Sequence, residues 1–355
     1  MAENRRAKDT ESNSSLISAE EAALYDRQIR LWGLDAQKRL RASNVLLFGL
    51  NGLGAEICKN IVLCGVKSLT LMDNQNVTED DYTAQFLIPR ADLGKNRAKA
   101  CLARAQRLNP MVEIRTDIEE IKTKDSKFFK DFDVVILTGC ALDVMVQVNE
   151  ICHELKIKFY AGDVFGFFGF AFNDLVQHKF VEEQKKSTGV NLTENEVPPQ
   201  KKAKQEETET ILIEKFLDFT TLEKALDTTW VKDQKPKFLK RISKVYFIFQ
   251  VLLRFHQANG RNPQGLTSTQ DIVDLQKIKR EVLKYMETDE DLISDDFARH
   301  CMGTISPTCS VIGGILSQDV IKALSGKDAP INNFFFFDGL TGEGMVECLP
   351  IKSSH

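Results

Sequence analysis

The fold is decided by residues 45–54, which read Val45-Leu46-Leu47-Phe48-Gly49-Leu50-Asn51-Gly52-Leu53-Gly54. Their apolar start is typical of a strand that is buried on both faces of a parallel sheet. The glycines then break the strand and open a predicted helix, which runs from Ala55 to about Leu63. A second apolar run at residues 69–72 ends on Asp73. Strand, glycine turn, helix and strand together predict a βαβ nucleotide-binding unit.

The turn supplies the candidate cofactor-binding residues, which are Gly49, Gly52, Gly54 and Asp73. Glycines let the backbone approach a phosphate, and the amino end of a helix favours an anion. An acid about 20 residues beyond such glycines can bond a ribose hydroxyl. Asn51 stands where the G-x-G-x-x-G pattern has its middle glycine, and its side chain crowds the place of closest approach to phosphate. The pattern therefore supports the fold, whereas Asn51 argues against a nucleotide held on this chain.

Further strands and helices alternate outward from the turn. Strands are predicted at residues 112–115, 132–137, 158–162 and 165–170, and helices at 95–108 and 144–155. This alternation predicts an α/β fold with a Rossmann-like, doubly wound and mostly parallel sheet. Aromatic residues alternate with glycine in the last of these strands, which indicates an antiparallel extension of the sheet at its edge.

The composition along the chain predicts one α/β domain that is interrupted by an insertion. The predicted parts are a disordered N-terminus (1–17), the first part of the domain (18–177), the insertion (178–299), the second part of the domain (300–350) and a tail (351–355). Within the insertion, the charged residues 182–209 predict a flexible loop, and residues 211–299 predict a small, mostly helical domain. The second part includes Phe334-Phe335-Phe336-Phe337-Asp338-Gly339, which predicts a strand followed by a turn.

Composition argues against several classes of protein. The 355 residues carry a net charge of −4, which gives no reason to expect binding to nucleic acid. No run approaches the about 18 apolar residues of a membrane span. The eight cysteines lack C-x-x-C spacing and the five histidines are dispersed, so no metal site is expected. Reduced, buried cysteines indicate a cytosolic or nuclear protein. Lys201-Lys202-Ala203-Lys204 fits either a nuclear-import signal or a solvated charged loop.

The amino end carries a second motif. Ser18, with Glu21 three residues later, forms a helix-capping signature. The predicted helix then carries Tyr25-Asp26-Arg27-Gln28-Ile29-Arg30-Leu31-Trp32-Gly33. Other features accompany it, namely the glycine turn, Asp73, Gln85-Phe86-Leu87, Gly162-Asp163, Gly313-Gly314 and Phe337-Asp338-Gly339. Over about residues 18–180 and 300–350, this set resembles the adenylation domains of ubiquitin-like-modifier activating enzymes and their bacterial ThiF/MoeB relatives.

Within that family, the chain is similar to the smaller, Aos-type subunits of SUMO-activating heterodimers. The similarity lies in the opening motif, the short lysine-rich insertion and the run Asn332-Asn333-Phe334-Phe335-Phe336-Phe337-Asp338-Gly339. The resemblance implies a non-catalytic subunit of the sumoylation pathway. Its catalytic, Uba-type partner would bind ATP and Mg²⁺, adenylate the carboxyl end of SUMO and form the thioester on its own cysteine. SUMO would reach this chain through the complex, in the nucleus and also in the cytoplasm.

The residues with which the family's active domains bind ATP are largely replaced here. At those positions the chain carries Asn51, Gln75, Asp81, Ala84, Arg97 and Cys140. Adenylation needs cations and Mg²⁺ to hold charge on phosphate oxygens as pyrophosphate leaves. Ala84 stands where the family has an arginine and cannot pair with phosphate, and Gln75 and Cys140 are weak substitutes for carboxylates beside a hard cation. The resemblance therefore implies a silent site on this chain, with Asp73 and the glycines as vestiges.

One residue keeps a chemical role by the same resemblance. In the family, the arginine of the opening motif reaches across the dimer into the partner's ATP site, and here it is Arg27. A guanidinium from a neighbouring subunit can stabilise phosphate charge as arginine fingers do. Arg30 is the lesser candidate. The alternative is an ordinary helix-surface arginine, with Arg27 paired to Asp26 or Glu21. Leu31 and Trp32 are expected to pack the helix onto the core or onto a dimer interface.

Three other functions remain open. A self-sufficient homodimeric adenylating enzyme of the ThiF/MoeB kind would need the arginine and the acid that Ala84 and Cys140 replace. A nicotinamide dehydrogenase would use the Rossmann-like unit, but the sequence offers no histidine or lysine as a general acid at a strand end. A pure interaction module would leave Arg27 without a chemical role. Pyrophosphate exchange by the chain alone and nicotinamide binding discriminate among these functions.

Overall fold

A computed structural model describes residues 18–186, 209–232, 234–263 and 269–351. Its centre is an eight-stranded sheet with the strand order β10-β9-β6-β5-β4-β1-β2-β3. The strands are β1 (Asn44–Phe48), β2 (Ser68–Met72), β3 (Glu113–Asp117), β4 (Val134–Thr138), β5 (Lys158–Phe165), β6 (Phe168–Asp174), β9 (Phe334–Asp338) and β10 (Glu343–Glu347). Neighbouring strands in the part β3-β2-β1-β4-β5 of the sheet are parallel, and neighbouring strands in the part β5-β6-β9-β10 are antiparallel. The predicted mostly parallel, doubly wound α/β sheet is confirmed.

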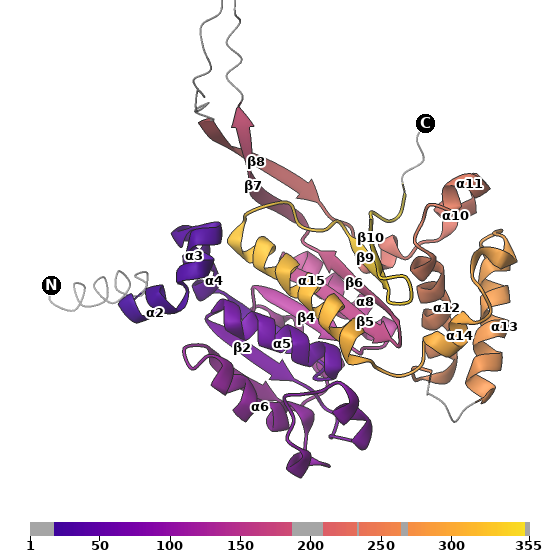
Figure 1. Ribbon diagram of the computed structural model, residues 1–355, viewed down its shortest axis with the longest axis horizontal. Helices are drawn as coiled ribbons and strands as arrows, with labels where there is room; N and C mark the ends of the chain where they lie inside the picture. Colours follow the sequence, from indigo (N-terminus) through magenta and orange to yellow (C-terminus); the bar gives the residue numbers. More distant parts are fainter. Residues whose placement is uncertain (1–17, 187–208, 233, 264–268, 352–355) are drawn as a thin grey trace, which may run out of the picture.

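Helices cover one face of the sheet beside the glycine turn (Figure 1). They are α4 (Leu34–Ala42), α5 (Gly52–Cys64), α6 (Arg97–Leu108) and α15 (Ser306–Ser325), and α2 (Ala19–Leu24) and α3 (Asp26–Trp32) lie at one end of this layer beside α4. Side chains alternate along each strand, so Val45 and Leu47 of β1 enter the core under α5 and α15, whereas Leu46 and Phe48 enter the core on the opposite face. This alternation with both sides buried explains the continuous apolar runs of the parallel strands.

The opposite face is covered by helices from two parts of the chain. These are α7 (Ser126–Phe129), α8 (Leu142–Leu155), α9 (Leu222–Ala225), α10 (Thr229–Lys232), α11 (Pro236–Leu239), α12 (Lys244–Asn259), α13 (Thr269–Tyr285) and α14 (Phe297–His300). The rings of Phe249 in α12 and Phe170 in β6 have centroids 4.3 Å apart, and Tyr246 contacts Phe336 of β9 edge-on. The predicted helical insertion therefore shares one apolar core with α8 and the sheet.

Short 3₁₀ helices connect these elements: η1 (Glu79–Thr83), η2 (Arg90–Asp92), η3 (Ile121–Thr123) and η4 (Glu290–Leu292). Among the described residues, no helix has both the length and the apolar character needed to cross a membrane.

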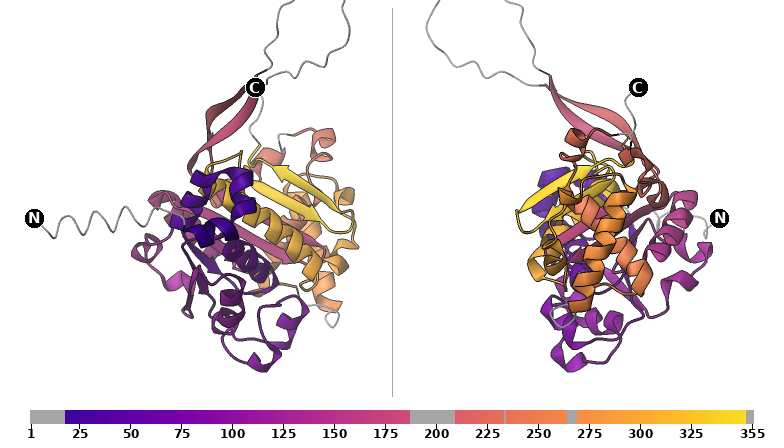
Figure 2. Two further views of the ribbon diagram at one scale, coloured as in Figure 1. Left: turned by 60° about the vertical axis from the view of Figure 1, so that its left-hand side comes forward. Right: turned by 90° about the vertical axis from the view of Figure 1, so that its right-hand side faces the viewer.

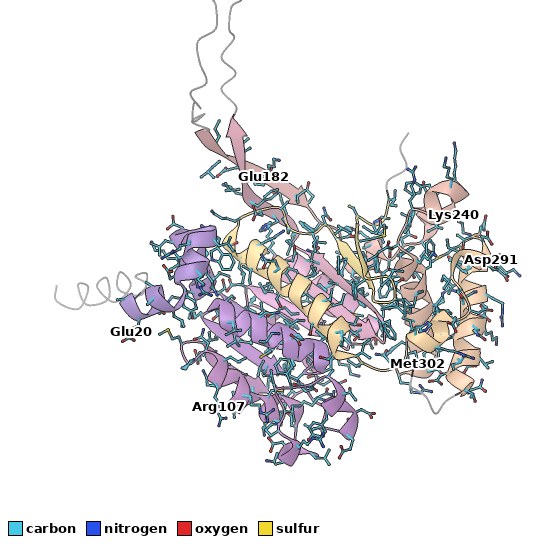
Figure 3. All side chains as sticks on the ribbon, in the orientation of Figure 1. Glu20, Arg107, Glu182, Lys240, Asp291 and Met302 are labelled. Atoms are coloured by element: carbon cyan, nitrogen blue, oxygen red, sulfur yellow. The ribbon has the colours of Figure 1, made fainter. Side chains whose placement is uncertain are left out.

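The first part of the insertion forms two strands, where the sequence predicted a loop over residues 182–209 and helix from residue 211. The strands β7 (Gln177–Lys186) and β8 (Glu209–Asp218) form a two-stranded ribbon that projects from the body of the molecule (Figure 1). The β-branched Ile211 and Ile213 favour this extended conformation over the predicted helix. Glu182, labelled in Figure 3, pairs across the ribbon with Lys215. The rest of the predicted charged loop, with Lys201, Lys202 and Lys204, lies outside the described residues, as do residues 1–17 and 352–355.

Candidate functional site

The glycine turn is shaped by contacts within the chain. Gly49 has φ +89°, and a Cβ on it would lie 2.0 Å from the carbonyl oxygen of Thr138. A Cβ on Gly54 would lie 1.9 Å from the carbonyl oxygen of Gly49. A Cβ on Gly52 would lie 2.5 Å from the Cβ of Ala84. The fold itself therefore requires these three glycines, and their presence is no proof of a nearby phosphate.

Asn51 occupies the amino end of the helix that would receive an anion. It is the N-cap of α5, and its Oδ1 accepts hydrogen bonds from the amide of Gly54 (2.9 Å) and the hydroxyl of Thr138 (3.3 Å). An amide that could donate to a phosphate is thus already satisfied by the chain's own side chain. The sequence identified Asn51 as an obstacle because of its bulk. Its preference for the N-cap position was the signal that would have predicted this hydrogen bond.

Asp73 lies at the end of β2, where a ribose-binding acid is expected. It is buried, and both carboxylate oxygens accept backbone hydrogen bonds at 2.7 Å, one from Leu50 and the other from Gln75. Burial raises the pKa of the Asp73 carboxyl, and these hydrogen bonds act in the opposite direction. Asp73 therefore fastens the glycine turn to the residues after β2, which is a structural role that needs no ligand.

Two of the replaced family positions pair with each other. Arg97 at the start of α6 contacts Asp81 in η1 through two nitrogens, Nη2 to Oδ1 at 3.0 Å and Nε to Oδ2 at 3.1 Å. Asp81 also accepts hydrogen bonds from the amide and hydroxyl of Thr78. The Asp81 side chain is 5% exposed and the Arg97 side chain 21%, so the pair is largely shielded from water. This contact holds the Arg97 guanidinium against the protein.

The remaining replaced residues offer little to a metal–nucleotide complex. Ala84 is buried against Gly52, and the Gln75 side chain is within 3.5 Å of Asn74 at the surface. Burial raises the pKa of the Cys140 thiol well above its usual value, so it remains protonated and a poor ligand for a hard cation. Among the described residues, no group of three or more His, Cys, Asp or Glu side chains is placed to hold a metal ion.

A cavity of about 360 Å³ lies at the carboxyl ends of β1, β2 and β4. Its ionisable lining residues are Asp73, Arg97, Glu120, Lys122, Asp143 and His256. Arg97 is paired with Asp81, and Lys122 with Glu120 at 3.0 Å. Burial lowers the pKa of His256, which therefore adds no positive charge at neutral pH. Because the lysine and arginine of this lining are already paired with carboxylates, neither is free to compensate the charge of a triphosphate. The sequence did not predict that His256, from the insertion, would line this cavity.

Helix α3 is held against the body by contacts of Tyr25 and Gln28. The Tyr25 ring is buried and packs directly against Gly65, where a Cβ would lie only 2.5 Å from the ring. The Tyr25 hydroxyl accepts a 2.7 Å hydrogen bond from the side-chain amide of Asn109. The Gln28 amide donates to the carbonyl oxygen of Leu63 (3.1 Å), in the last turn of α5. These contacts set the position of α3 beside the carboxyl end of α5.

Arg27 is left exposed by these arrangements. Arg30 pairs with Asp26 through two contacts of 3.1 Å, and Arg41 pairs with Glu21 at 2.8 Å. The alternative pairing of Arg27 with either acid is therefore not what the structure contains. Within the described part of the chain, the Arg27 guanidinium makes no ion pair or hydrogen bond. Trp32 packs against the core, as one of its two predicted placements has it, whereas Leu31 is 75% exposed and does not. A dimer interface at Leu31 stays a prediction.

The structure separates the two predicted groups of site residues. Gly49, Gly52, Gly54 and Asp73 come together at the amino end of α5, whereas Arg27 and Arg30 lie beside its carboxyl end. The helix has 13 residues, which at 1.5 Å per residue gives a length of about 20 Å. Arg27 is therefore too far from its own chain's cavity to act there.

Comparisons with known proteins identify the family of the chain. A family model described as the ThiF family matches residues 25–355. A human protein named SUMO-activating enzyme subunit 1 is 50% identical over 336 residues, which cover 95% of this chain and 97% of that protein. Proteins with the same name from Xenopus laevis and Danio rerio are 50% and 48% identical, and each alignment covers 96% of this chain and 99% of the relative.

Proposed function

The chain belongs to the ThiF family, and from this premise we propose that it is the small, non-catalytic subunit of a SUMO-activating heterodimer. A catalytic partner subunit binds ATP and Mg²⁺, adenylates the carboxyl end of SUMO and then forms a thioester on its own cysteine. This chain completes the partner's ATP site. It meets SUMO only as part of the complex and acts in protein sumoylation.

One observation carries the proposal: Arg27 is an exposed, unpaired guanidinium about 20 Å from its own chain's cavity, by the length of α5. A cation in this position acts on a site that another chain supplies. There its fixed positive charge and several donors stabilise the phosphate oxygens as pyrophosphate leaves. Arg30, the weaker candidate, is engaged with Asp26 and serves the helix.

The internal contacts of the vestigial site support the proposal that this chain is non-catalytic. Asn51 satisfies the amino end of α5, Asp73 binds backbone amides, and Arg97 is neutralised by Asp81. Each group that an active adenylation domain would offer to nucleotide is thus used by the fold. We therefore assign ATP and Mg²⁺ to the partner and none to this chain, which makes it a pseudoenzyme subunit.

The test compares this chain, the catalytic chain and their mixture in a SUMO-dependent ATP–pyrophosphate exchange assay. The proposal predicts negligible exchange by this chain alone and full exchange by the mixture. Exchange by this chain alone, at a rate near that of the mixture, would support a self-sufficient adenylating enzyme instead. Failure of the mixture to form a complex would contradict the assignment as a subunit.

We also propose that the heterodimer works mainly in the nucleus, with Lys201, Lys202 and Lys204 as the import signal. Replacing these three lysines with serine should shift the chain towards the cytoplasm while the complex still forms. Nuclear accumulation is measured by imaging a fluorescent fusion. If it is unchanged, the three lysines are not an import signal.

A further inference from the structure

The strand β10 is one of the two edges of the eight-stranded sheet. Its three central residues, Gly344, Met345 and Val346, carry no charge, and Met345 and Val346 are 36% and 54% exposed. The hairpin of β9 and β10, yellow in Figure 2, runs along the outside of the molecule. An edge strand has backbone N–H and C=O groups without a partner in its sheet, so the edge formed by β10 is open to pairing with another strand.

The other edge strand, β3, differs from β10 in its charges. Glu113, Arg115 and Asp117 occupy every second position of β3. Arg115 pairs with Glu113 at 2.8 Å, and Lys124 pairs with Asp117 at 2.7 Å. Charged side chains along an edge strand protect it against pairing with foreign strands. The centre of β10 has no such protection.

A run of positive charge precedes the helix that packs under β9. Residues 235–244, which end in the first turn of α12, contain no acidic residue and five cations: Lys235, Lys237, Lys240, Arg241 and Lys244. All five side chains are exposed. Within the ranges that the structure describes, none of them takes part in an ion pair. In a chain with a net charge of −4, this segment is a local concentration of unpaired positive charge.

A cavity of about 540 Å³ joins the basic segment to the sheet edge. Lys240, Arg241 and Lys244 line one side of this cavity, and Gly344 and Met345 of β10 line the other. A strand that paired with the edge of β10 would therefore pass beside three cations. Alternate side chains of such a strand point to the same face of the sheet, so an acid at every second position would meet these cations.

Two carboxylates also line the cavity, but they leave an excess of positive charge. Asp338 is used by the turn between β9 and β10, where its Oδ1 accepts hydrogen bonds from the amides of Leu340 (2.9 Å) and Thr341 (3.4 Å). Glu343 lies at the start of β10 and is exposed. The lining thus contains three cations and two carboxylates, and the rest of the basic segment adds further positive charge. This balance favours an occupant with negative charge.

We propose that β10 and residues 235–244 together bind an extended acidic segment of another protein, which adds to β10 as a ninth strand. Backbone hydrogen bonds to β10 fix the register of the added strand, and its carboxylates face Lys240, Arg241 and Lys244. Charge complementarity identifies the occupant as acidic. The open sheet edge identifies it as a polypeptide and not a nucleic acid, because only a polypeptide continues the ladder of N–H and C=O groups.

The test measures binding of a labelled peptide of alternating glutamate and valine to the full-length chain by fluorescence anisotropy. The triple variant Lys240→Glu/Arg241→Glu/Lys244→Glu should weaken binding by about tenfold or more, as the loss of three exposed charge contacts does. The matched control is Lys277→Glu/Arg280→Glu/Lys284→Glu, which reverses the same kinds of exposed charge on α13, outside this cavity. The control should bind as the wild type does. Equal weakening by both triple variants, or no binding by the wild type, would overturn the proposal.

Two further measurements distinguish an added strand from a charge contact alone. A peptide of alternating glutamate and proline has the same charge, but proline lacks the N–H and the extended φ of a ladder strand. It should bind at least about tenfold more weakly than the valine peptide. The valine peptide should also slow hydrogen exchange of the β10 amides, as strand pairing does. Equal affinity for the two peptides, or unchanged exchange in β10, would show that no strand is added.

A competitor of the other macromolecular class completes the test. Single-stranded oligothymidylate of the same net charge as the valine peptide should displace the labelled peptide less effectively than unlabelled valine peptide does. Displacement by the oligonucleotide at a lower concentration, with the same loss in the Lys240→Glu/Arg241→Glu/Lys244→Glu variant, would assign the basic segment to nucleic acid and contradict the proposal.

Discussion

At the scale of single residues, the vestigial site shows how a nucleotide pocket can be turned into structure. Asp81 and Arg97 stand at two of the replaced positions, and their two-point contact neutralises the charge of Arg97 within the protein. Asn51 closes the helix end in the same way. Each substitution looks like a simple loss in the sequence, but in the fold each provides a contact that stabilises the loop around the cavity.

The Asp81–Arg97 pair should therefore contribute measurably to stability. Asp81→Ala leaves a partly buried guanidinium uncompensated and should cost about 3 kcal/mol of unfolding free energy, in the range for breaking a shielded ion pair. The double variant Asp81→Ala/Arg97→Ala should lose less than the sum of the single variants by about 1–3 kcal/mol. Urea denaturation of the four proteins gives the coupling energy directly. Additive losses would mean that the two side chains do not stabilise each other.

The buried Asp163 in β5 predicts a pH dependence of stability. Burial raises the pKa of its carboxyl to about 6. The folded pKa lies above the unfolded value of about 3.9, so this group's contribution to stability is fully present below about pH 4 and is lost as the pH rises through 6. Asp163→Asn cannot ionise. Its stability relative to wild type should improve by about 2–3 kcal/mol between pH 4 and pH 7.

The measurement is the unfolding free energy of both proteins in urea at a series of pH values. Glu113→Gln, at an exposed position of the edge strand β3, serves as the control for general effects of carboxyl removal. A constant difference between Asp163→Asn and wild type from pH 4 to pH 7 would show that Asp163 does not titrate in this range.

At the scale of elements, the inserted helices form part of the core on one face of the sheet. The α12 rings reach the strands of both halves of the domain, since Phe249 contacts Phe170 in β6 and lies near Phe334 and Phe336 in β9. A block with this much aromatic contact cannot unfold without exposing one face of the sheet. The insertion and the α/β domain should therefore unfold together.

Phe249→Ala tests this coupling. Removing the ring should cost about 3–5 kcal/mol and leave a cavity in the core that both parts share. The two tryptophans report on different regions, Trp32 on the N-terminal helices and Trp230 on the insertion. Single-tryptophan proteins should show coincident urea transitions, with and without Phe249→Ala. A transition seen by Trp230 at lower urea than by Trp32 would show that the insertion is an independent domain.

At the scale of the whole molecule, sequence predicted what depends on local pattern. The glycine turn, the buried parallel strands and the four-phenylalanine strand follow from spacing and apolar runs, and the sheet contains them as expected. The ribbon of β7 and β8 was missed, because its two strands are far apart in the sequence, separated by residues 187–208, and the pairing between them is not a local pattern. The ion pair of Asp81 with Arg97 and the exposure of Arg27 likewise depend on tertiary contacts. The spacing of residues in the sequence does not predict such contacts.

The central claim is that Arg27 completes the ATP site of another chain, and it is tested by pyrophosphate exchange in the reconstituted heterodimer. Arg27→Ala should slow SUMO-dependent exchange by about 10- to 1000-fold, as loss of a charge stabiliser in the transition state does. Arg27→Lys should recover only part of the rate, because a point charge cannot reproduce two-point contact. Arg30→Ala is the matched control on the same helix, and it should exchange at close to the wild-type rate, with every complex intact on gel filtration. Wild-type exchange by an intact Arg27→Ala complex would contradict the account.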